Sequence, residues 1–191
     1  MAEEIIAALL QWHSVSNPAG FGELDGPFYG SWLDFYRKRL QLYYDEICNG
    51  RDSAGVLSNY VIETAARSLA SLDDILRNAR KDAVLIHSDY WLPNILINPA
   101  QYRLAGVIDP LDAEWADPEL DLILLEWPWG DKDYLLRLYQ QHVSLPDGFP
   151  LRYALYRFWY AIQTFARIGW HDEQCDREVA DELNKAMDSY L

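Results

Sequence analysis

The sequence LIHSDYWLPN occupies residues 85–94, and the shorter sequence VID follows at residues 107–109. The first begins inside an apolar run, 83–87, whose length and composition predict a short buried strand. Two further apolar runs, 95–97 and 103–108, predict a second and a third strand, which an Asn-Pro-Ala turn would join. The stretch therefore predicts a strand, a polar loop and a β-hairpin in succession.

Three side chains that carry oxygen atoms lie at the ends of these predicted strands. The first strand delivers Asp89 into the loop, Asn94 leaves the loop where the hairpin begins, and Asp109 follows the hairpin. Magnesium favours oxygen ligands and usually keeps waters and substrate phosphates in its shell, so two protein ligands are sufficient. Asp89 is then free to accept the proton of a substrate hydroxyl. The alternative is that an Asp and an Asn at this spacing only cap turns, as in many loops.

The sequence around these residues resembles a known superfamily. The motif HSDYWLPN at residues 87–94, followed by ID at residues 108–109, is similar to the catalytic and metal-binding segments of the aminoglycoside phosphotransferases and fructosamine kinases. These enzymes are small-molecule relatives of the protein kinases. The sequence DPLDAEWADPELDL at residues 109–122 strengthens the resemblance, although Ala116 stands where the superfamily usually has glycine. Ser88 likewise replaces the glycine or arginine often found between the histidine and the aspartate.

The resemblance implies a role for each residue that matches the superfamily motif. Asp89 would be the catalytic base, and Asn94 and Asp109 would hold Mg²⁺. His87 would support the loop, and Asp121 would anchor its backbone by accepting hydrogen bonds from amide groups. The implied activity is that of an ATP-dependent phosphotransferase, with ATP and Mg²⁺ as cofactors and a small hydroxyl-bearing acceptor.

The implied acceptor is an amino sugar or a fructosamine, while choline-like and homoserine-like acceptors stay open. Residues 21–22 and 30–36 resemble the fructosamine kinase branch. No acceptor-binding residue is assigned from the sequence. Tyr156, Trp159 and Tyr160 lie on an apolar late helix, which we interpret as core packing rather than as the wall of an acceptor pocket.

The resemblance also implies a β-rich N-terminal lobe that covers the nucleotide, and no part of the sequence matches it. The glycines at 20, 22, 26 and 30 follow no strand, and Lys38 lies within a predicted helix. We therefore expect the chain to be the C-terminal lobe only, with the N-terminal ATP-covering lobe absent. The alternative is a non-catalytic, pseudokinase-like binding module or remnant without turnover. A homo-oligomer or a partner lobe would then cover the exposed face.

Length and composition limit the remaining possibilities. A chain of 191 residues predicts a single domain, 1–191. Sixteen basic against 30 acidic residues give a net charge of −14, which argues against nucleic-acid binding and would attract a cationic acceptor. Cys48 and Cys175 fit neither a disulfide framework nor a metal site. The acidic N-terminus does not resemble a signal peptide, and no apolar run has membrane-spanning length, so we expect a cytoplasmic protein.

Three groups of polar side chains outside the motif are given structural roles. Asp117 is expected to cap a helix, and Asp112 and Glu114 are expected to be solvated loop carboxylates. His13 has no partner at ligand spacing and is interpreted as a surface or core histidine.

The predicted fold class is α+β and mostly helical. By resemblance it is a protein-kinase-like C-terminal lobe, with a small β-hairpin that carries the catalytic and metal-binding loops. Helical periodicity predicts helices at about 3–14, 31–49, 54–79 with a break near Ser71, 118–127, 131–142, 150–169 and 173–190.

Overall fold

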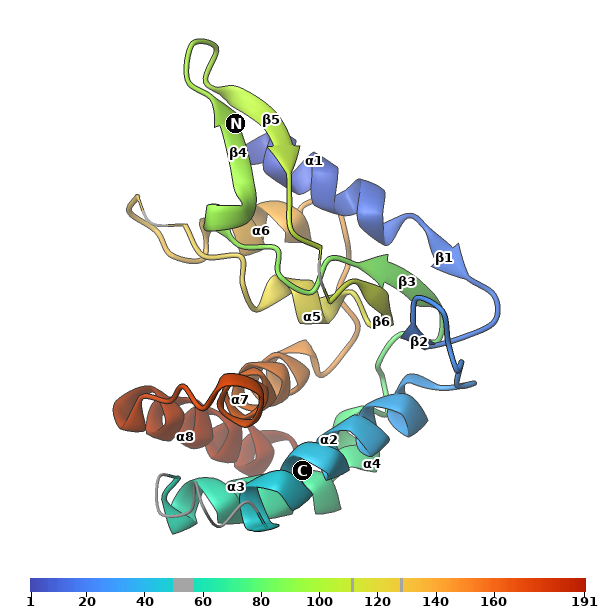
Figure 1. Ribbon diagram of the computed structural model, residues 1–191, viewed down its shortest axis with the longest axis vertical. Coiled ribbons are helices and arrows are strands. Elements are labelled where there is room, and N and C mark those ends of the chain that lie inside the picture. The colour runs from blue at the N-terminus through green and yellow to red at the C-terminus, as the bar shows by residue number, and fades with distance from the viewer. Residues whose placement is uncertain (50–56, 111, 128) are drawn as a thin grey trace. The chain divides into compact units, whose positions relative to one another are not determined.

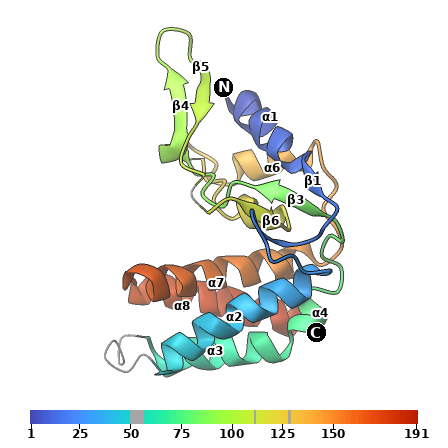
Figure 2. The same cartoon turned by 45° about the vertical axis from the view of Figure 1, so that its right-hand side comes forward.

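The computed structural model describes residues 1–49, 57–110, 112–127 and 129–191. The chain is mostly helical with small antiparallel sheets, and it divides into two compact units (Figures 1 and 2). Unit 1 comprises Met1–Trp32 and Arg80–Pro146, and unit 2 comprises Leu33–Ala79 and Asp147–Leu191. The predicted fold class is confirmed, whereas the single domain stays a prediction.

Unit 1 contains a four-stranded antiparallel sheet assembled from segments distant in the sequence. Its strands are β1 (Ser16–Asn17), β2 (Gly22–Glu23), β3 (Ala83–Ile86) and β6 (Glu114–Ala116), in the spatial order β1-β3-β6-β2. Ala83, Val84 and Ile86 are buried, which places β3 in the core of the unit. The loop that follows β3 therefore begins from a fixed point.

A separate hairpin, β4 (Ile95–Asn98) and β5 (Arg103–Val107), follows that loop and runs beside helix α1 (Ala2–His13) (Figures 1 and 2). The Asn98 side chain accepts hydrogen bonds from two amides of the turn, an arrangement that asparagine favours. The carboxylate of Glu4 on α1 accepts a hydrogen bond from the Leu104 amide, which attaches the hairpin to the helix. The hairpin thus has a defined position within unit 1.

Unit 2 is helical. It contains α2 (Trp32–Asn49, whose first residue belongs to unit 1), α3 (Asn59–Ala70), α4 (Leu72–Ile75), α7 (Phe149–Ile168) and α8 (Glu173–Tyr190). Helix α7 packs against α8, and α8 also packs against α3. The core of the unit is rich in aromatic residues, including Tyr156, Phe158 and Trp159, all with 1% exposure or less. The interpretation of Tyr156 and Trp159 as core residues is confirmed, whereas Tyr160 is 37% exposed.

The predicted helices are mostly confirmed, with three helical regions shortened. The region expected at 54–79 contains α3 and α4, which separate at Ser71 as predicted, while residues 54–56 lie outside the described residues. The helix expected at 118–127 is only α5 (Glu119–Leu122), and the one at 131–142 is only α6 (Tyr134–Gln140). The Trp127 amide donates to the Lys132 carbonyl, so these two residues, each expected in a helix, pair with each other instead.

The strands β1, β2 and β6 were not predicted. They have only two or three residues, too few for an alternating pattern to be recognised. Glu114, expected to be solvated, lies in β6 and is only 5% exposed, so that prediction is wrong. Among the described residues, no helix is both long enough and apolar enough to span a membrane.

Candidate active site

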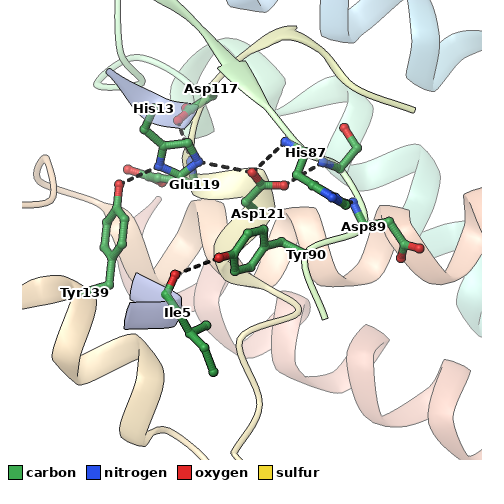
Figure 3. A network of polar contacts seen from close by, with 10 residues as sticks. Ile5, His13, His87, Asp89, Tyr90, Asp117, Glu119, Asp121 and Tyr139 are labelled. Atoms are coloured by element: carbon green, nitrogen blue, oxygen red, sulfur yellow. Dashed lines mark hydrogen bonds and ion pairs between the residues drawn. The ribbon is translucent and has the colours of Figure 1, made fainter. Parts of the chain in front are cut away.

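The loop after β3 makes a sharp turn that is held by one carboxylate. Ser88 has a φ of 64°, in the left-handed region that glycine adopts at lower cost. The consecutive backbone amides of His87 and Ser88 donate to Oδ2 and Oδ1 of Asp121, at 2.8 and 2.7 Å. Asp121 lies on α5 and is fully buried (Figure 3). The carboxylate therefore fixes the backbone that leads into Asp89.

Asp89 and Asn94 are in direct contact at the two ends of the loop. The Asn94 amide nitrogen donates to Oδ2 of Asp89 at 2.7 Å and to its backbone carbonyl at 3.0 Å. A short 3-10 turn, Leu92–Asn94, brings Asn94 back to this position. Since Nδ2 is used by Asp89, Oδ1 of Asn94 is the atom left to act as a ligand. Asn94 is buried and Asp89 is half-buried.

Asp109 is brought near these residues by the backbone of the hairpin. The Ile108 amide donates to the Asn94 carbonyl at 3.0 Å, so Asp109 comes one residue after that contact. Its φ of 63° turns the chain there, and its side chain is exposed. Among the described residues, its carboxylate makes no hydrogen bond to Asp89 or Asn94, and no three His, Cys, Asp or Glu residues form a metal-binding group.

His87 lies beneath the loop and is fully buried. Its Nδ1 accepts a hydrogen bond from the Asp89 amide at 3.3 Å, and its ring packs edge-on against Trp12 and Tyr90. The Tyr90 hydroxyl donates to the Ile5 carbonyl of α1 at 2.6 Å (Figure 3). Burial raises the pKa of Tyr90, so the hydroxyl keeps its proton and remains a donor. The loop is thereby packed onto α1.

Two buried residues that sequence reasoning did not connect with the site, His13 and Tyr139, extend the hydrogen bonds of Asp121. His13 ends α1, and its Nε2 lies 3.1 Å from Oδ2 of Asp121. Its Nδ1 lies 2.9 Å from the hydroxyl of Tyr139 on α6 (Figure 3). His13 is 7% exposed, so it is a core histidine, one of the two roles predicted. The partners are 108 and 126 residues away in the sequence, and no local pattern points to them.

Asp117 lies just before α5, close to its predicted position as a cap. Its side chain accepts a hydrogen bond from the Glu119 amide at 3.0 Å, while Pro118 occupies the N-cap position itself. Both acidic side chains are buried. The start of α5, and with it the position of Asp121, is therefore fixed by local hydrogen bonding.

Comparison with known proteins gives these features a context. The profile of a family described as "Phosphotransferase enzyme family" matches residues 1–150. A curated relative, the uncharacterized protein YcbJ of Escherichia coli K12, is 22% identical over 169 residues, which cover 88% of this chain and 56% of YcbJ.

Solved structures share the fold. A protein assigned as a fructosamine-3-kinase from Thermobifida fusca has a TM-score of 0.73 at 22% identity, with 98% of this chain and 65% of that chain covered. The complex of APH(2")-IIa with gentamicin has a TM-score of 0.61 at 19% identity, covering 100% of this chain and 60% of that one. A mutant of the aminoglycoside phosphotransferase APH(4)-Ia, in a ternary complex with AMP-PNP and hygromycin B, has a TM-score of 0.58 at 18% identity, covering 98% and 66%. This chain thus spans less than two thirds of the length of YcbJ and of the Thermobifida protein. The family profile covers more than half of the sequence, and the chain belongs to the phosphotransferase enzyme family.

Proposed function

We propose that this chain carries the catalytic lobe of an ATP-dependent kinase that phosphorylates a hydroxyl group of a small molecule. The observation that carries the proposal is the contact between Asp89 and Asn94 at 2.7 Å, on a loop whose backbone is fixed by Asp121. Phosphoryl transfer depends mainly on positioning and charge stabilisation, so a rigid loop with a half-exposed carboxylate suits it. The complex of a structural relative with AMP-PNP supports ATP as the phosphate donor.

In this proposal Asp89 is the catalytic base. Its Oδ2 is held by Asn94, and the carboxylate accepts the proton of the acceptor hydroxyl. The acceptor oxygen then forms a bond to the γ-phosphorus as the bond to the bridging oxygen breaks, and ADP leaves. His87 and Asp121 support the loop without touching the substrate.

The donor set of the site suits Mg²⁺. Asn94 has its Oδ1 left for a ligand. The exposed Asp109 directly follows Ile108, whose amide donates to the Asn94 carbonyl. Both groups present oxygen atoms, which Mg²⁺ prefers. Mg²⁺ held by these residues would neutralise charge on the phosphates of the bound nucleotide.

An amine-bearing sugar, such as an amino sugar or a fructosamine, is the acceptor class that we propose. The net charge of −14 favours a cationic ligand, and relatives in this family include a protein assigned as a fructosamine-3-kinase and an enzyme complexed with gentamicin. We place the reaction in the cytoplasm, where ATP is supplied.

The test is an ADP-release assay on the full-length protein with Mg²⁺, ATP and a panel of fructosamines and aminoglycosides. Asp89→Asn should lower kcat by about 10²–10⁴-fold, the usual contribution of a general base. The matched control is Asp82→Asn, an exposed aspartate before β3 that should leave the rate unchanged. Calorimetry should show that Asp109→Ala weakens Mg²⁺-dependent ATP binding.

Two results would contradict the proposal. If Asp89→Asn and the wild type phosphorylated the acceptor at equal rates, Asp89 would not be the catalytic base. Nucleotide binding with no turnover on any acceptor would instead favour the non-catalytic, pseudokinase-like module.

A further inference from the structure

The Asp121 carboxylate accepts hydrogen bonds from three donors. Two are the amides of His87 and Ser88, and the third is the ring nitrogen Nε2 of His13, which lies 3.1 Å from Oδ2. Asp121 is fully buried and His13 nearly so. A buried carboxylate is stable only when its oxygens are satisfied, so each donor contributes to the position of this group.

The two partners of His13 determine which ring nitrogen carries the proton. A carboxylate only accepts hydrogen bonds, so the proton of a neutral ring is on Nε2, the atom that faces Asp121. Nδ1 is then an acceptor, and the buried hydroxyl of Tyr139, which lies 2.9 Å away, donates to it. Burial raises the pKa of Tyr139, so this hydroxyl keeps its proton. The chain of donors runs in one direction, from Tyr139 through His13 to Asp121.

The loop needs this support because its backbone is strained. Ser88 has a φ of 64°, which costs about 1–2 kcal/mol for a residue with a Cβ atom. Such conformations persist only where the surroundings hold them firmly. Asp121 supplies that restraint at Ser88, one residue before Asp89. A rotation of the Asp121 side chain would release the backbone that leads into the site.

We propose that His13 and Tyr139 are positioning residues. They hold the Asp121 carboxylate in one orientation, which keeps the backbone of the loop, and with it the Asp89 side chain, in position. This inference rests on the proposed function, but its structural part is testable without turnover. His13 lies at the end of α1 and Tyr139 on α6, so two helices of unit 1 converge on the loop through one carboxylate.

The experiment combines NMR with kinetics on the full-length protein. In protein with ¹⁵N-labelled histidine, His13 should have the proton on Nε2, and Tyr139→Phe should move the Nδ1 resonance, because that nitrogen loses its hydrogen-bond donor. His13→Leu should move the backbone amide resonances of His87 and Ser88, because their shared acceptor loses its third donor. His13→Gln keeps an N–H group near Nε2 and should restore most of the wild-type shifts.

In the phosphorylation assay, His13→Leu should lower kcat by about 10- to 100-fold with little change in the KM of the acceptor. His13→Gln should recover most of that loss, which a merely structural role would not predict. His142→Gln is the control, because that histidine is also in unit 1 and its side chain is 47% exposed. If His13→Leu does not fold, Tyr139→Phe gives the same test through the Nδ1 resonance and the two amides.

Unchanged amide resonances in both variants, or a His13 ring protonated only on Nδ1, would overturn the proposal. So would a loss of kcat that His13→Gln fails to recover in a folded protein. If the resonances shift as expected while even the wild-type protein phosphorylates no acceptor, the positioning network stands and the proposed function fails.

Discussion

The two units differ in how their buried polar side chains are arranged. In unit 1, the buried side chains of His13, His87, Asn94 and Asp121 all hydrogen-bond around one loop. In unit 2, the core is largely aromatic and aliphatic. Its few buried charged groups in the described part of the chain, such as Arg152 and Asp176, surround no such loop, and ion pairs such as Arg67 with Asp188 lie at the surface.

The difference shows what each unit needs from its interior. Burying a polar group costs free energy unless every hydrogen bond is made, whereas burying apolar area is favourable without precise partners. Unit 2 can therefore tolerate volume-conserving changes in its core. Unit 1 holds one loop in a strained conformation, so it depends on a few specific donors and acceptors.

The largest effect is expected at Asp121. Asp121→Asn places an amide N–H against donors that already face the site, so the free energy of unfolding should fall by about 3 kcal/mol. Asp188→Asn is the matched change in unit 2, where the side chain is 67% exposed, and should cost less than about 1 kcal/mol. Urea unfolding followed by circular dichroism measures both. Similar losses in the free energy of unfolding for the two variants would mean that the two units do not differ in this respect.

The next largest effect is expected in the core of unit 2. Trp159 is 1% exposed and donates from Nε1 to the Ser68 hydroxyl at 3.1 Å. Trp159→Leu leaves a cavity and should lower the free energy of unfolding by about 2 kcal/mol. Trp170→Leu is the control, since Trp170 is 58% exposed and should change stability by less than about 0.5 kcal/mol. A small loss at Trp159 would mean that this core readily closes around a cavity.

A smaller effect of opposite sign is expected at Ser88. Ser88→Gly removes the strain of a positive φ, which is partly offset by the greater freedom of glycine in the unfolded chain, so a gain of about 0.5 kcal/mol is expected. Ser88→Ala keeps the strain and removes a buried hydroxyl that has no partner among the described residues. Thermal unfolding of the two variants separates the two contributions. A loss of stability in the glycine variant would show that the turn is not strained.

The smallest effect concerns a polar group buried in unit 2. Burial raises the pKa of Asp176, an effect that the nearby His171 partly opposes. A raised pKa in the folded state favours the protonated form, so this contribution to stability is fully present below the unfolded pKa and is lost as pH rises through the folded pKa. Asp176→Asn should therefore raise the melting temperature slightly at pH 7 and have little effect near pH 3. A decrease at pH 7 would mean that the ion pair with His171 outweighs burial.

Sequence reasoning worked best where the evidence was local. The strand, loop and hairpin lie within residues 83–108, and the period of α7 and α8 is visible in their apolar positions. It failed for β1, β2 and β6, because such short strands exist only through pairing with partners far along the chain. His13 was missed for the same reason, since its role depends on Asp121, 108 residues away. Local patterns thus predicted the loop, but not what holds it.

The long separations within the Asp121 network also bear on how the protein folds. Contacts between distant segments form slowly, because the entropy of closing large loops is lost before the contacts are made. His13 and Tyr139 meet across 126 residues, and both must be in place before Asp121 has its full set of partners. Residues 87–89 should therefore reach their native conformation late in folding. A chain that is only partly folded would then not hold Asp89 against Asn94, the contact on which the proposed catalytic role depends.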